Sequence, residues 1–143
     1  KVFAIDNSSK AIKIAERNKA DLVLKNVFFI EMNILEETPS DTYDIIVSNP
    51  PYIPKNEMTG LMPDVREYEP HNALTDFKDG LTFYKCLSKI GHNILNKDGW
   101  MITEVGTGGH PSSVLSIFNH SSYLNTELIK DYNGDNRILI AQV

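Results

Sequence analysis

The sharpest chemical feature of this sequence is the tetrapeptide Asn49-Pro50-Pro51-Tyr52, which directly follows the apolar run Asp44–Ser48. Two consecutive prolines remove two backbone donors and stiffen the chain, so that carbonyls are held outward as acceptors. The Asn49 side chain adds a carbonyl oxygen, and Tyr52 offers an aromatic face. Two convergent acceptors can hold the hydrogens of an NH2 group while its nitrogen faces an electrophile. The alternative is a strand that stops at a proline turn.

Three residues near the ends of two earlier apolar runs are candidates for binding a nucleoside cofactor. Asp6 follows the run Val2–Ile5, and a carboxylate there commonly accepts hydrogen bonds from both ribose hydroxyls. The alternative for Asp6 is a helix-capping aspartate. Asn33 and Ile34 lie just past a second run, Val27–Ile30, where they offer an adenine a polar contact and an apolar wall. A plain loop is the alternative for these two residues.

Alternating strands and helices are predicted to position these residues. Strands are predicted over residues 2–5, 27–30, 44–48 and 100–104, and helical spacing follows the first strand and recurs over 81–95 and near 112–118. The strands are apolar without alternation, as expected of parallel strands covered on both faces. Thr126–Ile129 and Ile138–Val143 read as a terminal antiparallel pair. The pattern predicts an α/β sandwich of the nucleotide-binding kind.

Two connections complete this prediction. Residues 53–79 have no clean period and contain three prolines and a glycine, which predicts a long irregular connection of functional character. Residues 96–99, reading NKDG, are predicted to form a turn before the strand over 100–104.

Composition limits the partners. The 143 residues, 41% of them hydrophobic, suit one domain with a real core. Nineteen acidic residues against fourteen basic ones give a net charge of −5, the wrong sign for binding a phosphate backbone, so a nucleic-acid substrate is disfavoured. No apolar run reaches the roughly 18 residues of a membrane span, and Cys86 is the only cysteine. We expect a cytoplasmic protein with no membrane partner and no metal site.

With Asp6, the NPPY tetrapeptide and the segment Asp64–Leu74 (DVREYEPHNAL), the chain resembles the HemK/PrmC family of release factor glutamine methyltransferases over essentially its whole length. NPPY alone is shared with methyltransferases that act on exocyclic amines of adenine or guanine. The DVREYEP…AL segment, and an EVG turn after WMITE, look specific to the release-factor branch. The resemblance implies a class I S-adenosylmethionine-dependent methyltransferase fold, a Rossmann-like α/β sandwich with a terminal antiparallel hairpin.

The resemblance also implies roles for the candidate residues. Asp6 would bind the cofactor ribose, Asn33 and Ile34 would lie near the adenine, and Asn49–Tyr52 would grip the substrate glutamine, with Asn49 also beside the cofactor. At the position of Asn33 the family commonly has Asp, but an amide can still hydrogen-bond the adenine amine. The implied reaction moves a methyl group from S-adenosylmethionine to a glutamine amide nitrogen of a peptide chain release factor, leaving S-adenosylhomocysteine. Asn49, Pro50 and Tyr52 are its predicted catalytic residues.

Charged residues around this site are assigned more loosely. Glu67, Glu69 and Glu104 are candidates for the pocket wall, with a solvated loop as the alternative for the first two. Arg66 is expected to pair with one of these glutamates.

The family's first strand and glycine-rich loop would lie upstream of Lys1, so residues 1–143 are expected to be a partial methyltransferase catalytic domain. That strand is central in the fold, so we expect unpaired backbone between the first and third predicted strands, weak cofactor affinity for the isolated chain, and self-association. Two other hypotheses stay open. One is methylation of an exocyclic amine of adenine or guanine, which the acidic charge disfavours. The other is an inactive fragment or binding module, which the missing loop favours.

Overall fold

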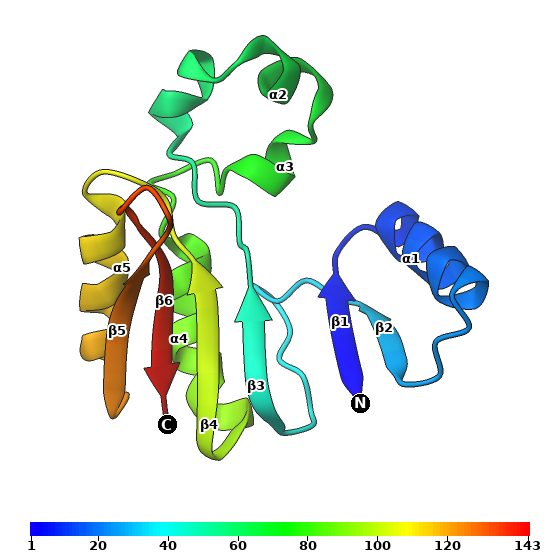
Figure 1. The fold of residues 1–143 in the computed structure, drawn as a ribbon. Coiled ribbons are helices and arrows are strands. Elements are labelled where there is room, and N and C mark those ends of the chain that lie inside the picture. Colours follow the sequence, from blue (N-terminus) through cyan, green and yellow to red (C-terminus); the bar gives the residue numbers. More distant parts are fainter. The chain divides into compact units, whose positions relative to one another are not determined.

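The computed structural model describes all 143 residues and divides them into two compact units, Lys1–Pro39 and Ser40–Val143. The first unit has a two-stranded sheet and one helix. The second has a four-stranded sheet, two longer helices and a group of short helices (Figure 1). None of the helices has the length and apolar character needed to cross a membrane. That residues 1–143 form one partial domain stays a prediction.

The first unit is a strand, a helix and a strand. The parallel pair consists of β1 (Val2–Asp6) and β2 (Val27–Glu31), which are connected by α1 (Ser9–Asp21) (Figure 1). The helix follows the first strand as the sequence predicts, and the Ser8 hydroxyl oxygen caps its start by accepting the Ala11 N–H at 3.3 Å. No residue of α1 is buried. The unit therefore has little core of its own.

The second unit is built on a mixed sheet with the strand order β3-β4-β6-β5. The strands are β3 (Tyr43–Ser48), β4 (Leu95–Glu104), β5 (Asn125–Lys130) and β6 (Asn136–Gln142). β3 and β4 are parallel, whereas β6 runs antiparallel to both β4 and β5, which confirms the predicted terminal pair. β1 and β3 lie in different sheets with one strand neighbour each, so each has an edge without strand pairing, as predicted.

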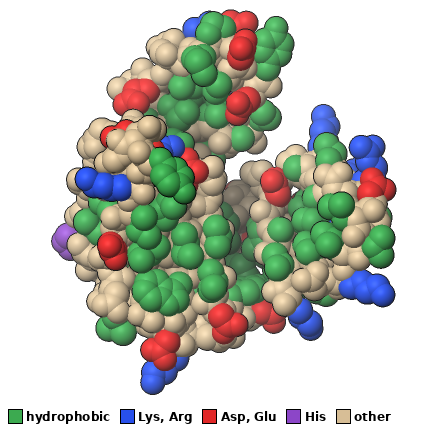
Figure 2. Space-filling view, in the orientation of Figure 1, with side chains coloured by type: hydrophobic (Ala, Val, Ile, Leu, Met, Phe, Trp, Pro, Cys, Tyr) green, Lys and Arg blue, Asp and Glu red, His purple; other side chains and the backbone are tan.

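Two helices cover one face of this sheet. α4 (Thr82–Ile94) contacts β4, α5 (His110–Asn119) contacts β5 and β6, and the helices contact each other (Figure 1). The main core side chains of the unit are Tyr84, Leu87, Ile90, Ile94, Met101, Val105, Val114, Phe118, Leu139 and Ala141. The other face is more open, with Ile45 57% and Val47 73% exposed, and Figure 2 shows hydrophobic side chains gathered there.

The connection over 53–79 is more regular than predicted. It contains η1 (Lys55–Gly60), α2 (Pro63–Tyr68) and α3 (His71–Leu74). Prolines stand at the N-caps of η1 and α3 and at the first residue of α2, where a proline starts a helix because its missing N–H is not needed. Each helix has four to six residues, too few to give a visible apolar period. The prediction of irregular structure was wrong for these residues.

The predicted turn over 96–99 instead lies inside β4. Asp98 has a positive φ of 64°, and an aspartate tolerates this left-handed conformation better than most residues. Its N–H donates to the Val143 carbonyl at 3.2 Å, and the Val143 N–H donates to the Gly99 carbonyl at 3.1 Å. The ladder therefore continues through an irregularity, and the prediction of a separate turn was wrong.

Packing at Gly91 gives a first test of this core. A Cβ at Gly91 would lie 2.1 Å from the Tyr123 hydroxyl oxygen, which is buried and has no hydrogen-bond partner. We expect Gly91→Ala to lower the free energy of unfolding by about 1–3 kcal/mol through overpacking. The loss should be smaller in a Tyr123→Phe background, because the remaining close atoms are the ring carbon at 3.4 Å and Cε of Met101 at 3.0 Å, the far end of a flexible side chain that can shift.

Urea denaturation of the four proteins in this cycle measures the coupling. Gly60→Ala is the matched control, since a Cβ there meets nothing within 4 Å. Equal losses in the wild-type and Tyr123→Phe backgrounds would contradict the packing described.

Candidate functional site

The predicted cofactor residues of the first unit lie at one edge of its sheet. Asp6 ends β1 and pairs in register with Glu31, the last residue of β2, and the Met32 N–H donates to the Asp6 carbonyl at 3.0 Å. Asn33 and Ile34 follow directly. Because parallel strands end at the same edge, all three predicted residues come together there.

Local hydrogen bonds hold these side chains in turns. Oδ1 of Asp6 accepts the Ser8 N–H at 2.7 Å, and Oδ1 of Asn33 accepts the Leu35 N–H at 3.2 Å. Ser8, rather than Asp6, is the N-cap of α1, so the helix-cap alternative for Asp6 is wrong. The Asp6 residue is exposed, and Asn33 and Ile34 are half-buried.

The tetrapeptide of the second unit leaves the end of β3 as predicted. Asn49 is exposed, Pro50 is buried, and Pro51 and Tyr52 are half-buried. The backbone after Tyr52 is fixed by the Ile53 N–H, which donates to a carbonyl of α3 at 2.9 Å. Asn49 is thus exposed to solvent, whereas the next residue, Pro50, is packed in the interior.

The Tyr52 hydroxyl is tied to two other strands. It donates to Oε1 of Glu104 at 3.0 Å, and it lies 3.4 Å from the Nη2 nitrogen of Arg137, which donates to it. The same Arg137 nitrogen donates to Oε1 of Glu104 at 2.9 Å, forming an ion pair with side chains only 26% and 34% exposed. We call these three residues the Tyr52 triad. It connects the corner after β3 to the end of β4 and the start of β6.

Tyr84 contacts the triad from the core. This fully buried residue of α4 donates its hydroxyl proton to the Glu104 backbone carbonyl at 2.6 Å. Burial, with smaller effects from Tyr52 and Glu104, raises the pKa of Tyr84 far above the ordinary value of 10. The hydroxyl is therefore a neutral donor near neutral pH.

His110 links the loops on either side of Tyr52. Its Nδ1 accepts the Gly106 N–H at 3.0 Å, so the ring is neutral and its Nε2–H donates to the Gly80 carbonyl at 3.2 Å. Its ring centroid lies 5.9 Å from that of Tyr52 and 5.2 Å from that of Tyr84.

Burial lowers the pKa of His110 below 6.5, and Arg137 acts in the same direction. The hydrogen bond to Gly80 and the charges of Glu57 and Asp79 oppose this shift. The neutral ring therefore dominates near neutral pH.

Gly80 approaches the corner more closely than any other residue type could. It has a φ of +78°, and a Cβ there would lie 2.2 Å from the Tyr52 carbonyl oxygen. The Asp76 carboxylate holds this loop by accepting the N–H groups of Lys78, Gly80 and Thr82 at 2.9, 2.9 and 3.0 Å. Burial is the largest single effect and raises the pKa of Asp76, but a hydrogen bond from the Thr82 side chain and those from the three N–H groups together lower it.

Sequence reasoning found part of this site. Glu104, a candidate for the pocket wall, does contact Tyr52. Glu67 and Glu69 are exposed, and Glu67 forms the predicted ion pair with Arg66 at 3.0 Å, so the solvated-loop alternative applies to them. Arg137, His110 and Gly80 were missed. Of these three, only Arg137 could have been noticed in the sequence, because it is a charged residue near the start of a mainly apolar strand.

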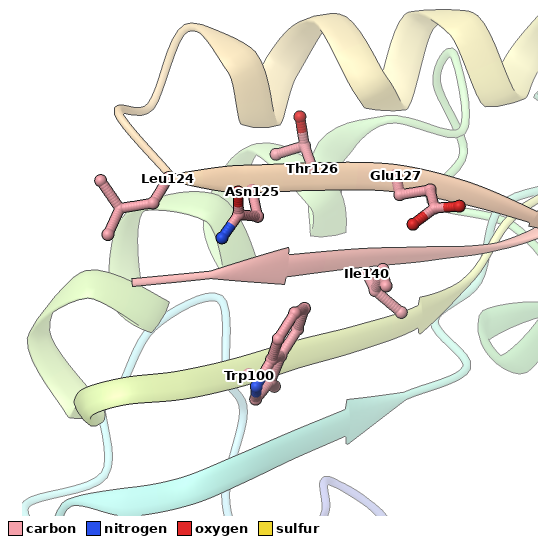
Figure 3. Close-up of a pocket in the computed structure, with 6 residues that line it drawn as sticks. All are labelled: Trp100, Leu124, Asn125, Thr126, Glu127 and Ile140. Carbon is pink, nitrogen blue, oxygen red and sulfur yellow. The ribbon is translucent and has the colours of Figure 1, made fainter.

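A hollow lies elsewhere, on the sheet surface (Figure 3). It has a volume of about 460 Å³ and is lined by Trp100, Leu124, Asn125, Thr126, Glu127 and Ile140. It includes no residue of the tetrapeptide or the Tyr52 triad. The chemistry predicted from the sequence does not use it.

Comparison with known proteins agrees with this arrangement. Residues 1–132 match the family model described as "Methyltransferase domain". The chain is 44% identical over 142 residues to the release factor glutamine methyltransferase of Fusobacterium nucleatum, covering 99% of this chain and 40% of that protein. It is 36% identical over 138 residues to the enzyme of the same name from Geobacter sulfurreducens, covering 96% and 48%. The chain thus spans less than half the length of these two relatives.

Solved structures support the fold. A methyltransferase from Pyrococcus furiosus matches with a TM-score of 0.72 and 20% identity, covering 99% of this chain and 62% of that one. The predicted α/β fold of the class I type is confirmed, and so is the resemblance to release factor glutamine methyltransferases.

The lowered pKa of His110 predicts how stability depends on pH. An unfolded histidine takes up a proton as pH falls through about 6.5, whereas folded His110 does so only at lower pH. The unfolded state therefore gains protons first, and the free energy of unfolding should fall with pH from about 6.5 to the folded pKa of His110. Urea denaturation followed by fluorescence of Trp100, the only tryptophan, measures this.

The control is His110→Gln, which keeps an acceptor and a donor but cannot titrate. It should flatten the slope in this pH window. The lowered pKa values of Asp76 and Asp79 act separately, below their ordinary 3.8. An unchanged slope in His110→Gln would contradict the prediction.

Proposed function

This chain belongs to the family of methyltransferase domains, and we propose that it transfers a methyl group from S-adenosylmethionine to the side-chain amide nitrogen of a glutamine in a peptide chain release factor. The observation that carries the proposal is the arrangement directly after β3. There Asn49 is exposed, and Tyr52, three residues later, is held by hydrogen bonds between its hydroxyl and the side chains of Glu104 and Arg137. The names of the two relatives support the choice of substrate.

The residues at the edge of the first unit fit a nucleoside cofactor. The exposed carboxylate of Asp6 suits the hydroxyls of a ribose, the amide of Asn33 suits the adenine amine, and Ile34 supplies an apolar surface. S-adenosylmethionine, when bound, supplies an electrophilic methyl group on a sulfonium sulfur. Asp6, Asn33 and Ile34 are therefore the residues that we propose hold the cofactor, with Asn49 as a further contact.

The second unit would prepare the nucleophile. An amide nitrogen is a poor nucleophile because its lone pair is delocalised into the carbonyl. The side-chain oxygen of Asn49 and the carbonyl of Pro50 would accept its two hydrogens, which orients the lone pair and stabilises the positive charge that develops on nitrogen. Pro51 stiffens the corner, and the ring of Tyr52 would pack on the planar amide. No strong base is needed beforehand, because the proton becomes acidic only after transfer.

We also propose where the enzyme works in the cell and what it binds. A translation release factor as substrate implies that the enzyme works in the cytoplasm. Exposed Ile45 and Val47, on an edge strand with one strand neighbour, support self-association of the isolated chain. The net charge of −5 supports a protein substrate rather than a nucleic acid.

The direct test is transfer of labelled methyl from S-adenosylmethionine to a release factor and to its Gln→Ala variant. Both this chain and a longer polypeptide that contains it should be assayed, with the Fusobacterium nucleatum relative as positive control. Glutamine-dependent labelling supports the proposal. Labelling of nucleic acid in place of the release factor would overturn it.

Replacing Asn49 separates its role from that of the cofactor residues. We expect Asn49→Ala to lower kcat by about 100-fold, because one preorganised hydrogen-bond partner of the reacting group is lost. The dissociation constant for S-adenosylhomocysteine, measured by calorimetry, should change much less. Asn18→Ala, on the exposed side of α1, is the control and should leave both unchanged. Equal losses in turnover and cofactor affinity would count against the assigned role of Asn49.

A further inference from the structure

We propose that Arg137 and Glu104 are positioning residues that hold the Tyr52 ring at the angle at which it packs on the substrate amide. The inference rests on the proposed function and adds two residues to it, both distant from the tetrapeptide in sequence. All of its members lie in the second unit, Ser40–Val143.

The contacts fall at the tip of the Tyr52 ring. The hydroxyl is the part of Tyr52 farthest from its backbone, so contacts at this atom restrain tilting of the ring most effectively. Both of its hydrogen-bonding capacities are used, since it donates to Glu104 at 3.0 Å and accepts from Arg137 at 3.4 Å. The guanidinium carbon of Arg137 also lies 5.9 Å from the ring centroid, within reach of a cation–π attraction.

Glu104 and Arg137, which hold the Tyr52 hydroxyl, are themselves fixed. The Val105 N–H donates to the Arg137 carbonyl at 2.9 Å, so the backbones of β4 and β6 set the separation of Glu104 and Arg137. Tyr84 holds the Glu104 carbonyl from the core at 2.6 Å. Both residues of the ion pair are therefore held by the strands β4 and β6.

The Tyr52 ring has little freedom on its other sides. The backbone of Gly106 runs close to the ring, since even an added Cβ there would lie only 3.3 Å from Cδ2 of Tyr52, and the His110 ring centroid lies 5.9 Å from that of Tyr52. These neighbours limit where the ring edge can go, whereas the triad fixes its tip. A substrate amide would meet a preorganised surface, which lowers the entropy lost on reaching the reactive geometry.

Arginine suits this role better than lysine. One guanidinium nitrogen donates to both the Glu104 carboxylate and the Tyr52 hydroxyl, and the planar group has a fixed direction. A lysine ammonium could keep the charge but not this geometry. We therefore expect Arg137→Lys to restore only part of the activity that Arg137→Met loses.

A double-mutant cycle tests the assignment in the polypeptide that shows glutamine methylation. Tyr52→Phe removes the hydroxyl but keeps the ring, and Arg137→Met removes the cation. Each should lower kcat by about 10- to 100-fold with little change in KM for S-adenosylmethionine. The double variant should be no worse than the more damaging single variant, because both changes release the same ring. Lys85→Met, which breaks the exposed Lys85–Asp79 pair, is the control and should keep wild-type kcat.

Multiplicative losses in the double variant would overturn the proposal, since Arg137 would then act independently of Tyr52. If Arg137→Met does not fold, Glu104→Gln replaces it in the cycle, because an uncharged amide weakens the same anchor.

A second measurement does not need catalysis. In the 143-residue chain with ring-labelled tyrosine, NMR signals of Tyr52 are assigned by their loss in Tyr52→Phe. The tethered ring should show restricted motion that Arg137→Met relaxes, whereas Lys85→Met should leave it unchanged. If the wild-type protein fails to methylate glutamine but the ring behaves as expected, the proposed function fails while the tether stands. An unchanged Tyr52 signal in Arg137→Met would overturn the tether.

Discussion

Parallel pairing of β3 with β4 is the constraint from which the geometry of the second unit follows. The register aligns Val47 with Ile102 and Ser48 with Thr103, so the residues that come next, Asn49 and Glu104, lie at the same edge of the sheet. Side chains far apart in the sequence therefore meet without any long loop having to be ordered. Neighbouring antiparallel β6 then brings Arg137 to the same edge, because its residue Ile138 pairs with Glu104.

A single buried polar contact ties the helical layer to this edge. Tyr84 is fully buried, and its hydroxyl reaches the carbonyl of Glu104, the last residue of β4. A buried hydroxyl without a partner costs about 1–3 kcal/mol, so any shift of α4 along the sheet that broke this bond would be penalised. Apolar packing alone would define the position of α4 along the sheet less precisely than this hydrogen bond does. Tyr123, whose buried hydroxyl has no partner, lacks this kind of anchor.

The sequence was sufficient where the decisive contacts are local. Apolar runs identified every strand, and the position of the tetrapeptide directly after the run over 44–48 could be read from the sequence. The expectation that these strands are covered on both faces was wrong for β3, where Ile45 and Val47 are exposed. The sequence was insufficient for contacts set by strand order. Arg137 lies 85 residues from Tyr52, and nothing in the sequence says that β6 inserts next to β4. Asp98 was misjudged because its backbone partner, Val143, is likewise distant.

Exposure distinguishes the Arg137–Glu104 pair, because each of the other three ion pairs, Lys19–Glu16 included, has at least one side chain that is 48% or more exposed. The Lys85–Asp79 and Arg66–Glu67 pairs have side chains 40–55% exposed, and such pairs contribute about 0–1 kcal/mol because water competes for both charges. The Arg137–Glu104 pair is less exposed, so water screens it less, and removing either partner leaves a half-buried charge. Its net contribution to folding is still modest, since desolvation offsets much of the attraction. The main effect of the pair is to orient Tyr52. Because two opposite charges both hydrogen-bond the Tyr52 hydroxyl, they define where that hydroxyl and its ring can lie.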